Sequence, residues 1–305
     1  MPSFDVYAFA DYSGAASEAA QRKAIALAVI DRAAPGKAAG ERRVPERVEP
    51  RITQGLTRST LLAQAQQLLR KATAEGQRVL LGFDHNYSFP SGFYEAVALS
   101  PWRRWEELLA WLHSSLTAYQ GADGLQPRAW AAAVNALLRD RFQLAEGPFW
   151  GPHFVPVRRS FPYGCSFAQP LPFTLRERRL VEERCPRMKP IYQIGGAGSV
   201  GLQSIYGMYS LYELISFCRE EGVPLHVWPY QGWDVPGKGH MLVEVYPTLY
   251  VTPGEKRTDA GDAAACAMMM YGQDRLGKLE TMLSEPDFTP EERERVLLEG
   301  WVLGV

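Results

Sequence analysis

Residues 4–14, FDVYAFADYSG, carry a strong strand signal near the start of the chain. Phe4 to Ala10 alternate and mix aromatic with small apolar side chains, and the run stops at the polar turn Asp11-Tyr12-Ser13-Gly14. A second stretch, RVLLGFDHN at residues 78–86, is a continuous apolar run that ends in Asp84. Such runs are typical of strands covered on both faces of a sheet. The sequence therefore predicts two buried strands, each with an aspartate at its end.

Between these two strands the sequence predicts two further strands and a helix. Ala24 to Ile30 is an apolar run that we interpret as a strand. Arg43 to Thr53 is extended but interrupted by prolines, which favours an edge strand. Ser59 can cap a helix that continues to about Ala74 with leucines along one face, and Gly76 ends it.

From residue 92 onward the pattern becomes helical, and it returns to strands only late in the chain. We divide the chain into a first core part (1–91), a helical and loop insertion (92–190) and a second core part with a tail (191–305). The expected helices and strands follow from capping residues and apolar periodicity. They are helices at 102–119 and 128–142, a helix capped by Thr174 and Glu177, a helix at 210–221, strands at 223–229 and 241–246, and a helix from about Asp259.

The charge balance is nearly neutral, which removes any whole-chain argument for nucleic-acid binding. The 305 residues are 46% hydrophobic and carry a formal net charge of -1, with a pI near 6.5. Bases outnumber acids locally between Arg158 and Lys189, a segment that could follow a phosphate backbone. The candidate contacts are Arg158, Arg159, Arg176 and Arg179. A solvated helix face with local ion pairs explains the same segment equally well.

The cysteines and the start of the chain indicate a cytoplasmic protein. Cys165, Cys185, Cys218 and Cys266 are widely spaced, so neither a zinc site nor a disulfide framework is indicated. The first residues lack the basic and apolar regions of a signal peptide, and no apolar run is long enough to cross a bilayer. We therefore expect reduced thiols and no membrane association.

Four carboxylates are the strongest candidates for chemistry: Asp11, Asp84, Glu244 within a late strand, and Asp262 near the start of a late helix. A carboxylate at the end of a buried run loses hydration and needs a cation, a positive partner or backbone donors. Mg²⁺ or Mn²⁺ prefers such oxygen ligands. Asp259 lies three residues before Asp262, on the same helix face. For Asp259 itself a helix-capping role is the simpler interpretation.

This order of elements resembles the RNase H-like superfamily. Within it, the chain is similar to an uncharacterised family of predicted RNase H-like nucleases. The similarity is carried by Gly82-Phe83-Asp84, by Val243-Glu244-Val245-Tyr246-Pro247 and by Asp259-Ala260-Gly261-Asp262-Ala263-Ala264, together with the glycine-rich residues 193–201. The resemblance covers most of the chain apart from parts of the insertion. It implies an α/β fold with a mixed five-stranded sheet flanked by helices and acids at one edge. The Asp-x-x-Asp pair is similar to that of Holliday-junction resolvases.

The same resemblance implies a two-metal nuclease. Asp11 would bridge the ions, Asp84 and Asp262 would each hold one, and Glu244 would complete the shell or orient water. RNase H proper carries a glutamate on its first helix, whereas the helix from Ser59 has no acid before Glu75. His85 and His240 are candidate proton carriers, although structural imidazoles are the simpler interpretation.

Two other classes of function remain open at the level of sequence. An actin-like ATPase shares the core topology and a similar turn after the first strand, but it needs a duplicated domain that we do not find. A non-catalytic module would hold a nucleotide or nucleic acid with Trp228, Tyr230 and Trp233, because aromatic rings can stack on bases. The glycine-rich residues 195–201 lack the ending of a P-loop. Their amides could touch a phosphate, but a flexible turn before the helix at Ser210 is slightly favoured.

Overall fold

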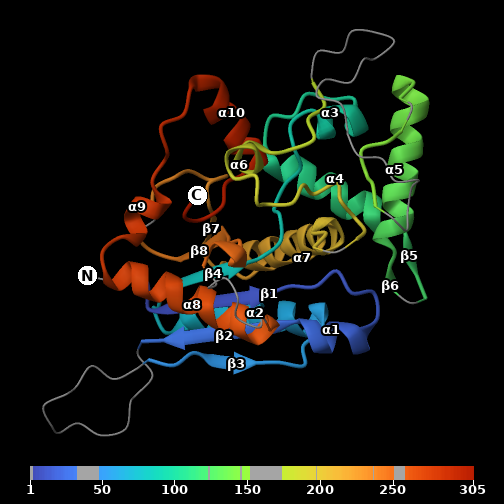
Figure 1. The fold of residues 1–305 in the computed structure, drawn as a ribbon. Coiled ribbons are helices and arrows are strands. Elements are labelled where there is room, and N and C mark those ends of the chain that lie inside the picture. The colour runs from blue at the N-terminus through green and yellow to red at the C-terminus, as the bar shows by residue number, and fades with distance from the viewer. Residues whose placement is uncertain are drawn as a thin grey trace, which may run out of the picture.

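The computed structural model describes residues 3–32, 48–122, 124–144, 146–151, 174–196, 198–235, 237–250 and 258–305 of the 305-residue chain. Within these ranges, six strands form one mixed sheet and two more form a short hairpin. Helices lie on both faces of the sheet (Figure 1). The fold is therefore α/β, a mixed sheet flanked by helices, as the sequence predicts.

The large sheet has the strand order β3-β2-β1-β4-β8-β7. β2 runs antiparallel to both of its neighbours, whereas β1, β4, β8 and β7 run parallel to one another. The strands are β1 (Val6–Asp11), β2 (Ala26–Asp31), β3 (Arg51–Thr53), β4 (Val79–Phe83), β7 (Leu225–Val227) and β8 (His240–Glu244), and the hairpin consists of β5 (Gln120–Gly121) and β6 (Gly124–Leu125). Because β1, β4 and β8 are parallel neighbours, their carboxyl ends meet at one edge of the sheet.

Threonine side chains cap several of the helices. Thr57 caps α2 by accepting from the Thr60 amide at 3.2 Å, and Thr289 caps α10 by accepting from the Glu292 amide at 3.2 Å. The helices are α1 (Glu18–Ala24), α2 (Arg58–Ala74), α3 (Phe93–Ala98), α4 (Trp105–Thr117), α5 (Pro127–Phe142), α6 (Leu180–Arg184), α7 (Gly201–Glu220), α8 (Asp259–Arg275), α9 (Leu279–Leu283) and α10 (Pro290–Glu299), with the 3-10 turn η1 (Pro247–Leu249).

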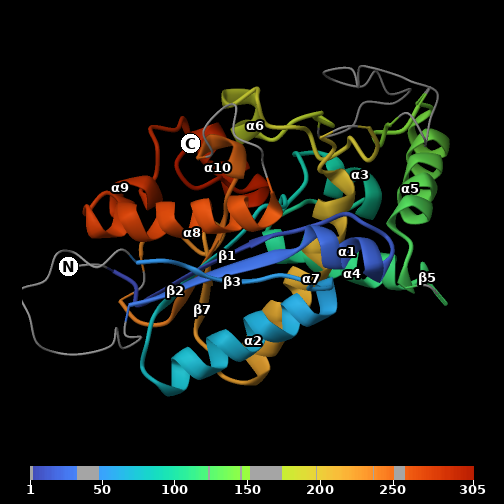
Figure 2. The ribbon, with the colours of Figure 1, turned by 60° about the horizontal axis from the view of Figure 1, so that its bottom comes forward.

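Strand β1 separates two hydrophobic cores, because successive side chains of a strand point to opposite faces. Val6, Ala8 and Ala10 pack on one face with residues of α2, α4 and α7. Tyr7 and Phe9 pack on the other face with residues of α8. Figure 2 shows α8 on one side of the sheet and α2 on the other. This double coverage explains why β1 is apolar throughout and buried at every position.

The segment expected to be an insertion packs against the core. Helix α4 contacts α7, and α10 contacts both α6 and α4. The ring of Trp105 in α4 stacks on Tyr230, which follows β7, with centroids 4.0 Å apart. Helices α4 and α5 therefore continue the layer formed by α7, whereas α6 packs in the other core with α10.

Several helix starts differ from the sequence-based expectations. The N-cap of α2 is Thr57 and not Ser59. Helix α7 begins at Gly201 and not at Ser210, so the glycine-rich residues lead directly into it. Helix α6 begins at Leu180, and its capping pair is Arg179 with Glu182 instead of Thr174 with Glu177. The short helix α1, between β1 and β2, was not predicted.

Among the helices of the described residues, none combines the length and apolar character required to cross a membrane.

Candidate functional site

The core of the site is a pair of aspartates at the carboxyl ends of β1 and β4. Asp11 is the last residue of β1, and Asp84 directly follows β4. The strands are parallel neighbours, with Ala10 opposite Phe83, so both side chains reach the same edge. The two carboxyl groups are hydrogen-bonded to each other. The sequence-based expectation that these two acids lie together agrees with this geometry.

Protein donors fix the position of the Asp84 carboxylate. The backbone amide of Tyr12 donates to Oδ1 at 2.6 Å. The side-chain amide of Gln203, in the first turn of α7, donates to Oδ2 at 3.2 Å and to the Asp84 carbonyl at 3.0 Å. Sequence reasoning missed Gln203, because nothing in its neighbourhood indicates that α7 starts beside the end of β4.

Helix α8 brings the remaining two aspartates to this edge. Asp259 is its first residue, and Asp262 lies one turn further on and is buried. Both carboxylates are close enough to Asp11 to affect its protonation. The N-cap is Thr258, whose hydroxyl oxygen accepts from the Gly261 amide at 3.0 Å. The expectation that Asp259 caps the helix is therefore wrong, and this carboxylate belongs to the acidic group.

Burial and mutual repulsion shift the ionisation of the pair. Burial raises the pKa of Asp11, and the negative charges of Asp84, Asp259 and Asp262 raise it further. Burial also raises the pKa of Asp84, while its hydrogen bonds with Asp11, Tyr12 and Gln203 oppose that rise. In the absence of a cation, burial and mutual repulsion therefore favour a pair that retains a proton.

The chemistry of this group suits a hard divalent cation, although the site is not preformed. All four candidate ligands are carboxylates, and oxygen donors with crowded negative charge are what Mg²⁺ and Mn²⁺ prefer. Within the described residues, no three acidic, histidine or cysteine side chains are arranged to hold a metal ion. The aspartates would have to shift to share one.

Glu244 is not available as a ligand, contrary to the sequence-based expectation. Arg179 binds both of its oxygens, with Nη2 2.6 Å from Oε1 and Nη1 2.8 Å from Oε2. The Tyr87 amide also donates to Oε2 at 3.1 Å. A carboxylate in a bidentate arginine pair has its charge compensated, so it needs no cation.

The prediction that Arg179 contacts nucleic acid is also wrong, because its side chain is fully buried. Its Nε also pairs with Glu182 at 2.8 Å, and Glu182 accepts from the Asn86 side chain at 2.7 Å. This buried network joins α6, β8 and the segment after β4. It has no clear signal in the sequence, since Arg179 is one of several consecutive charged residues.

Of the other proposed basic contacts, Arg176 is the one that lies in the described residues. Arg158 and Arg159 lie outside the described residues. Arg176 lies 4.0 Å from both Glu183 and Glu291, which agrees with the local ion-pair interpretation of this segment.

Both candidate histidines have structural positions. His85 is buried between aromatic rings, including Tyr12 at 5.0 Å and Phe83 at 5.5 Å, and burial lowers its pKa to about 4. His240 is at the opposite end of the sheet, where Nδ1 accepts from the Val79 amide at 3.2 Å. Burial lowers the pKa of His240 to about 4 as well. His240 therefore cannot transfer protons at the aspartates.

The aromatic residues considered for base stacking are packing residues. Trp228 is fully buried, and its indole NH donates to the Leu283 carbonyl at 2.9 Å. Tyr230 is stacked on Trp105, and Trp233 packs edge-on against Trp228 at 5.3 Å.

Three of the four cysteines lie in the described part of the chain. Cys218 and Cys266 are buried, and Cys185 is partly exposed. Cys165 lies outside the described residues.

The glycine-rich residues place the start of α7 against the turn that follows Asp11. A methyl group at position 14 would lie 2.8 Å from the backbone nitrogen of Gln203, so only glycine permits this approach. Gly196 and Gly198 have positive φ angles of 92° and 69°, which glycine adopts without strain. The stretch is thus a compact lead into α7, and it brings Gln203 to Asp84.

Comparison of the chain with protein families, with curated proteins and with solved structures found no match.

Proposed function

We propose that the protein is a metal-dependent nuclease that hydrolyses phosphodiester bonds of DNA or RNA at the aspartate cluster. The observation that carries this proposal is the hydrogen-bonded pair of Asp11 and Asp84, with Asp259 and Asp262 near enough to raise the pKa of Asp11. Such a concentration of buried negative charge is costly unless a cation compensates it.

Asp11, Asp84 and Asp262 are the residues that would hold Mg²⁺ or Mn²⁺, and Asp259 would add negative charge beside them. Bound divalent cations would activate water and neutralise the charge that develops on a phosphodiester. The chain itself orients the ligands. Tyr12 and Gln203 each fix one oxygen of Asp84, which leaves its carboxylate directed toward Asp11. Glu244 acts only through its pair with Arg179, which holds the end of β8.

The order of elements supports the same proposal. The resemblance to RNase H-like nucleases rests on the order of the elements. A strand that ends in Asp11 comes first, followed by two strands, a helix and the strand before Asp84, and a late strand and helix α8 complete the order. The sheet has one more strand than that resemblance implies, because β7 is added at the edge beyond β8.

The test is cleavage of labelled single-stranded, duplex and branched DNA and RNA in Mn²⁺ or Mg²⁺ and in chelator. Asp11→Asn and Asp262→Asn should abolish a metal-dependent activity. Asp140→Asn, an exposed aspartate on α5, is the matched control and should retain it. Cleavage that persists in both site variants would disprove the assignment.

The same preparation separates the alternatives. ATP hydrolysis without strand cleavage would favour an actin-like phosphotransferase, although the described residues contain one large sheet and not two. Metal-independent binding without turnover would favour a non-catalytic module.

A further inference from the structure

A large groove lies against the turn that follows β1, with a volume of about 1270 Å³. It is lined by the first turns of α2 and α5, the amino-terminal half of α7, residues of α1, the hairpin β5–β6 and the turn after β1. Pockets for small molecules usually have about 300 to 1,000 Å³, so this groove suits an extended ligand. Gly14 and Leu202 form part of its wall. Gly14 is three residues after Asp11, and Leu202 precedes Gln203, so this wall is formed by close sequence neighbours of the aspartate site.

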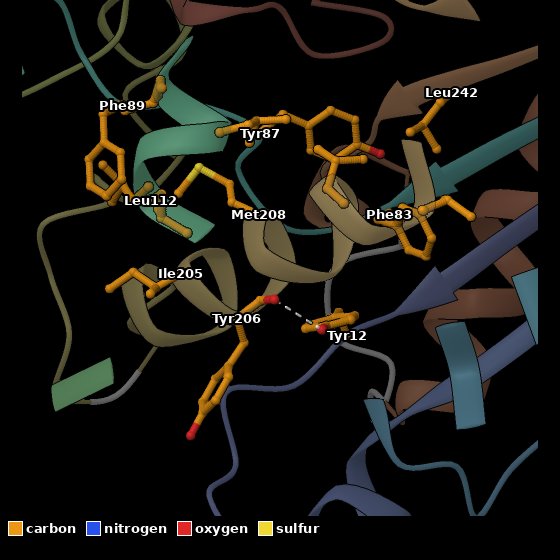
Figure 3. Packing of buried hydrophobic residues seen from close by; sticks show 14 of the residues in the cluster. Tyr12, Phe83, Tyr87, Phe89, Leu112, Ile205, Tyr206, Met208 and Leu242 are labelled. Atoms are coloured by element: carbon orange, nitrogen blue, oxygen red, sulfur yellow. Dashed lines mark hydrogen bonds between the residues drawn. The ribbon is translucent and has the colours of Figure 1, made fainter. Parts of the chain in front are cut away.

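Arg58 is a partly buried cation in the wall of this groove. Its Nη1 donates to the carbonyls of Ser13 at 3.0 Å and Ala15 at 2.6 Å. Its guanidinium carbon lies 3.5 Å from the ring centroid of Tyr206. Figure 3 shows Tyr206 beside Tyr12, whose hydroxyl donates to the Tyr206 carbonyl at 3.4 Å. These contacts place the guanidinium next to the strand that carries Asp11.

The positive charge of Arg58 has no acidic partner in the described part of the chain. Burial lowers the pKa of Arg58, and the only charged or polar groups that counter this effect are the phenols of Tyr12 and Tyr206. Arg58 is also the first residue of α2, whose first turn contains no acid. The helix dipole disfavours a cation at that position. Burial and the helix dipole both disfavour the charge of Arg58 at this position. An anion that enters the groove would compensate this charge.

Arg128 is the second arginine in the lining of the groove. Arg128 is exposed in the first turn of α5, close enough to Tyr206 to affect its ionisation, and it forms no ion pair with the described residues. Of the two glutamates in the lining, Glu18 pairs with Arg22 at 3.4 Å. Glu213 contacts the imidazole of His113 at 3.2 Å, which compensates its charge only when that imidazole is protonated. Arg58 and Arg128 have no acidic partner among the described residues.

We infer that this groove holds the sugar–phosphate backbone of a nucleic-acid strand, with Arg58 and Arg128 facing its phosphates. The inference rests on the proposed function, because it supplies the path by which a strand reaches the aspartates. It assigns nucleic-acid contact to the first turns of α2 and α5 and not to the basic segment around Arg176. The wall residues Gly14 and Leu202 would lie at the end of the strand nearest the scissile bond.

The test is binding of fluorescent single-stranded DNA, single-stranded RNA and duplex DNA, measured by anisotropy in chelator so that cleavage plays no part. Arg128→Gln should weaken binding about fivefold at 0.1 M salt and lower the salt slope by about 0.7, as expected for the loss of one phosphate contact. Arg58→Gln removes two hydrogen bonds as well, so Arg58→Lys accompanies it and should bind better than Arg58→Gln. Arg70→Gln is the control, because Arg70 lies on the same helix and pairs with Glu221 at 3.2 Å.

Binding that depends on Arg128 and Arg58, with Arg70→Gln unchanged, supports the groove even if no cleavage is found under any condition. Absence of binding to all three ligands overturns it. It is likewise overturned if Arg128→Gln binds as the unaltered protein does, or if polyglutamate of similar length competes as well as the oligonucleotide. Cleavage without arginine-dependent binding would retain the proposed function and reject the groove.

Discussion

Replacing Asp11 by asparagine should stabilise the metal-free protein and remove its response to metal. The carboxyl group of Asp11 has an ordinary pKa of 3.8, which burial and the charge of Asp84 raise strongly. The folded protein keeps the proton of this group at pH 7, whereas the unfolded chain releases it. This difference lowers the free energy of unfolding by up to about 4 kcal/mol, at about 1.4 kcal/mol for each unit of pKa. Relaxation of the surrounding protein and residual solvent at the site reduce this limit. We therefore expect Asp11→Asn to raise the free energy of unfolding by about 1 to 2 kcal/mol.

The sign of this effect depends on pH. Because the pKa of Asp11 is raised in the folded state, the unfolded chain binds fewer protons than the folded protein above about pH 4, and stability falls as pH rises. The advantage of Asp11→Asn should therefore grow between pH 4 and pH 8 and vanish near pH 4. Chemical denaturation in chelator across this range measures it, with Asp140→Asn as the control.

Bound metal should make the unaltered protein more stable than Asp11→Asn. A cation at ten times its dissociation constant stabilises the unaltered protein by about 1.4 kcal/mol, and Asp11→Asn should lose most of that gain. The reasoning is refuted if Asp11→Asn is less stable than the unaltered protein in chelator at pH 8. It is also refuted if Mn²⁺ stabilises both proteins equally.

Two further changes test the scaffold of the site, and a third tests the opposite end of the sheet. Gly14→Ala should cost about 1 to 3 kcal/mol and reduce any nuclease activity, because its methyl group would push against the backbone of Gln203; urea denaturation and cleavage assays measure this. Arg179→Met should cost about 3 to 5 kcal/mol by leaving the buried carboxylate of Glu244 without its cation, and thermal unfolding should show it. His240→Asn should reduce the loss of stability between pH 6.5 and pH 4, because the lowered pKa of His240 makes the unfolded chain bind more protons there.

Each of these three has an outcome that contradicts it. Unchanged stability in Gly14→Ala would mean that α7 does not press against the turn. A mild effect of Arg179→Met would show that Glu244 finds another partner and remains a candidate ligand. An identical pH profile for His240→Asn would place the acid sensitivity elsewhere, with buried His85 as the next residue to examine.

Much of the sheet was predictable because its strands carry local signals. The apolar runs ending in Asp11 and Asp84 are buried on both faces, which requires continuous hydrophobicity that the sequence displays directly. The start of α8 at Asp259 and the capping of α10 by Thr289 are local as well. The start of α7 was misjudged because glycines usually indicate a turn, whereas Gly201 is the first residue of the helix and lies where a Cβ would collide with the Ile191 carbonyl oxygen.

The sequence by itself determined which residues end the buried strands, since hydrophobic periodicity and the first polar residue after it are properties of neighbouring positions. Only the tertiary structure decided the partners of those residues. Glu244 and Asp84 both follow apolar strand residues, yet one is neutralised by Arg179 and the other faces Asp11. The difference arises because α6 and α7 arrive from distant parts of the chain, and electrostatic pairing depends on distance in space and not on separation in sequence.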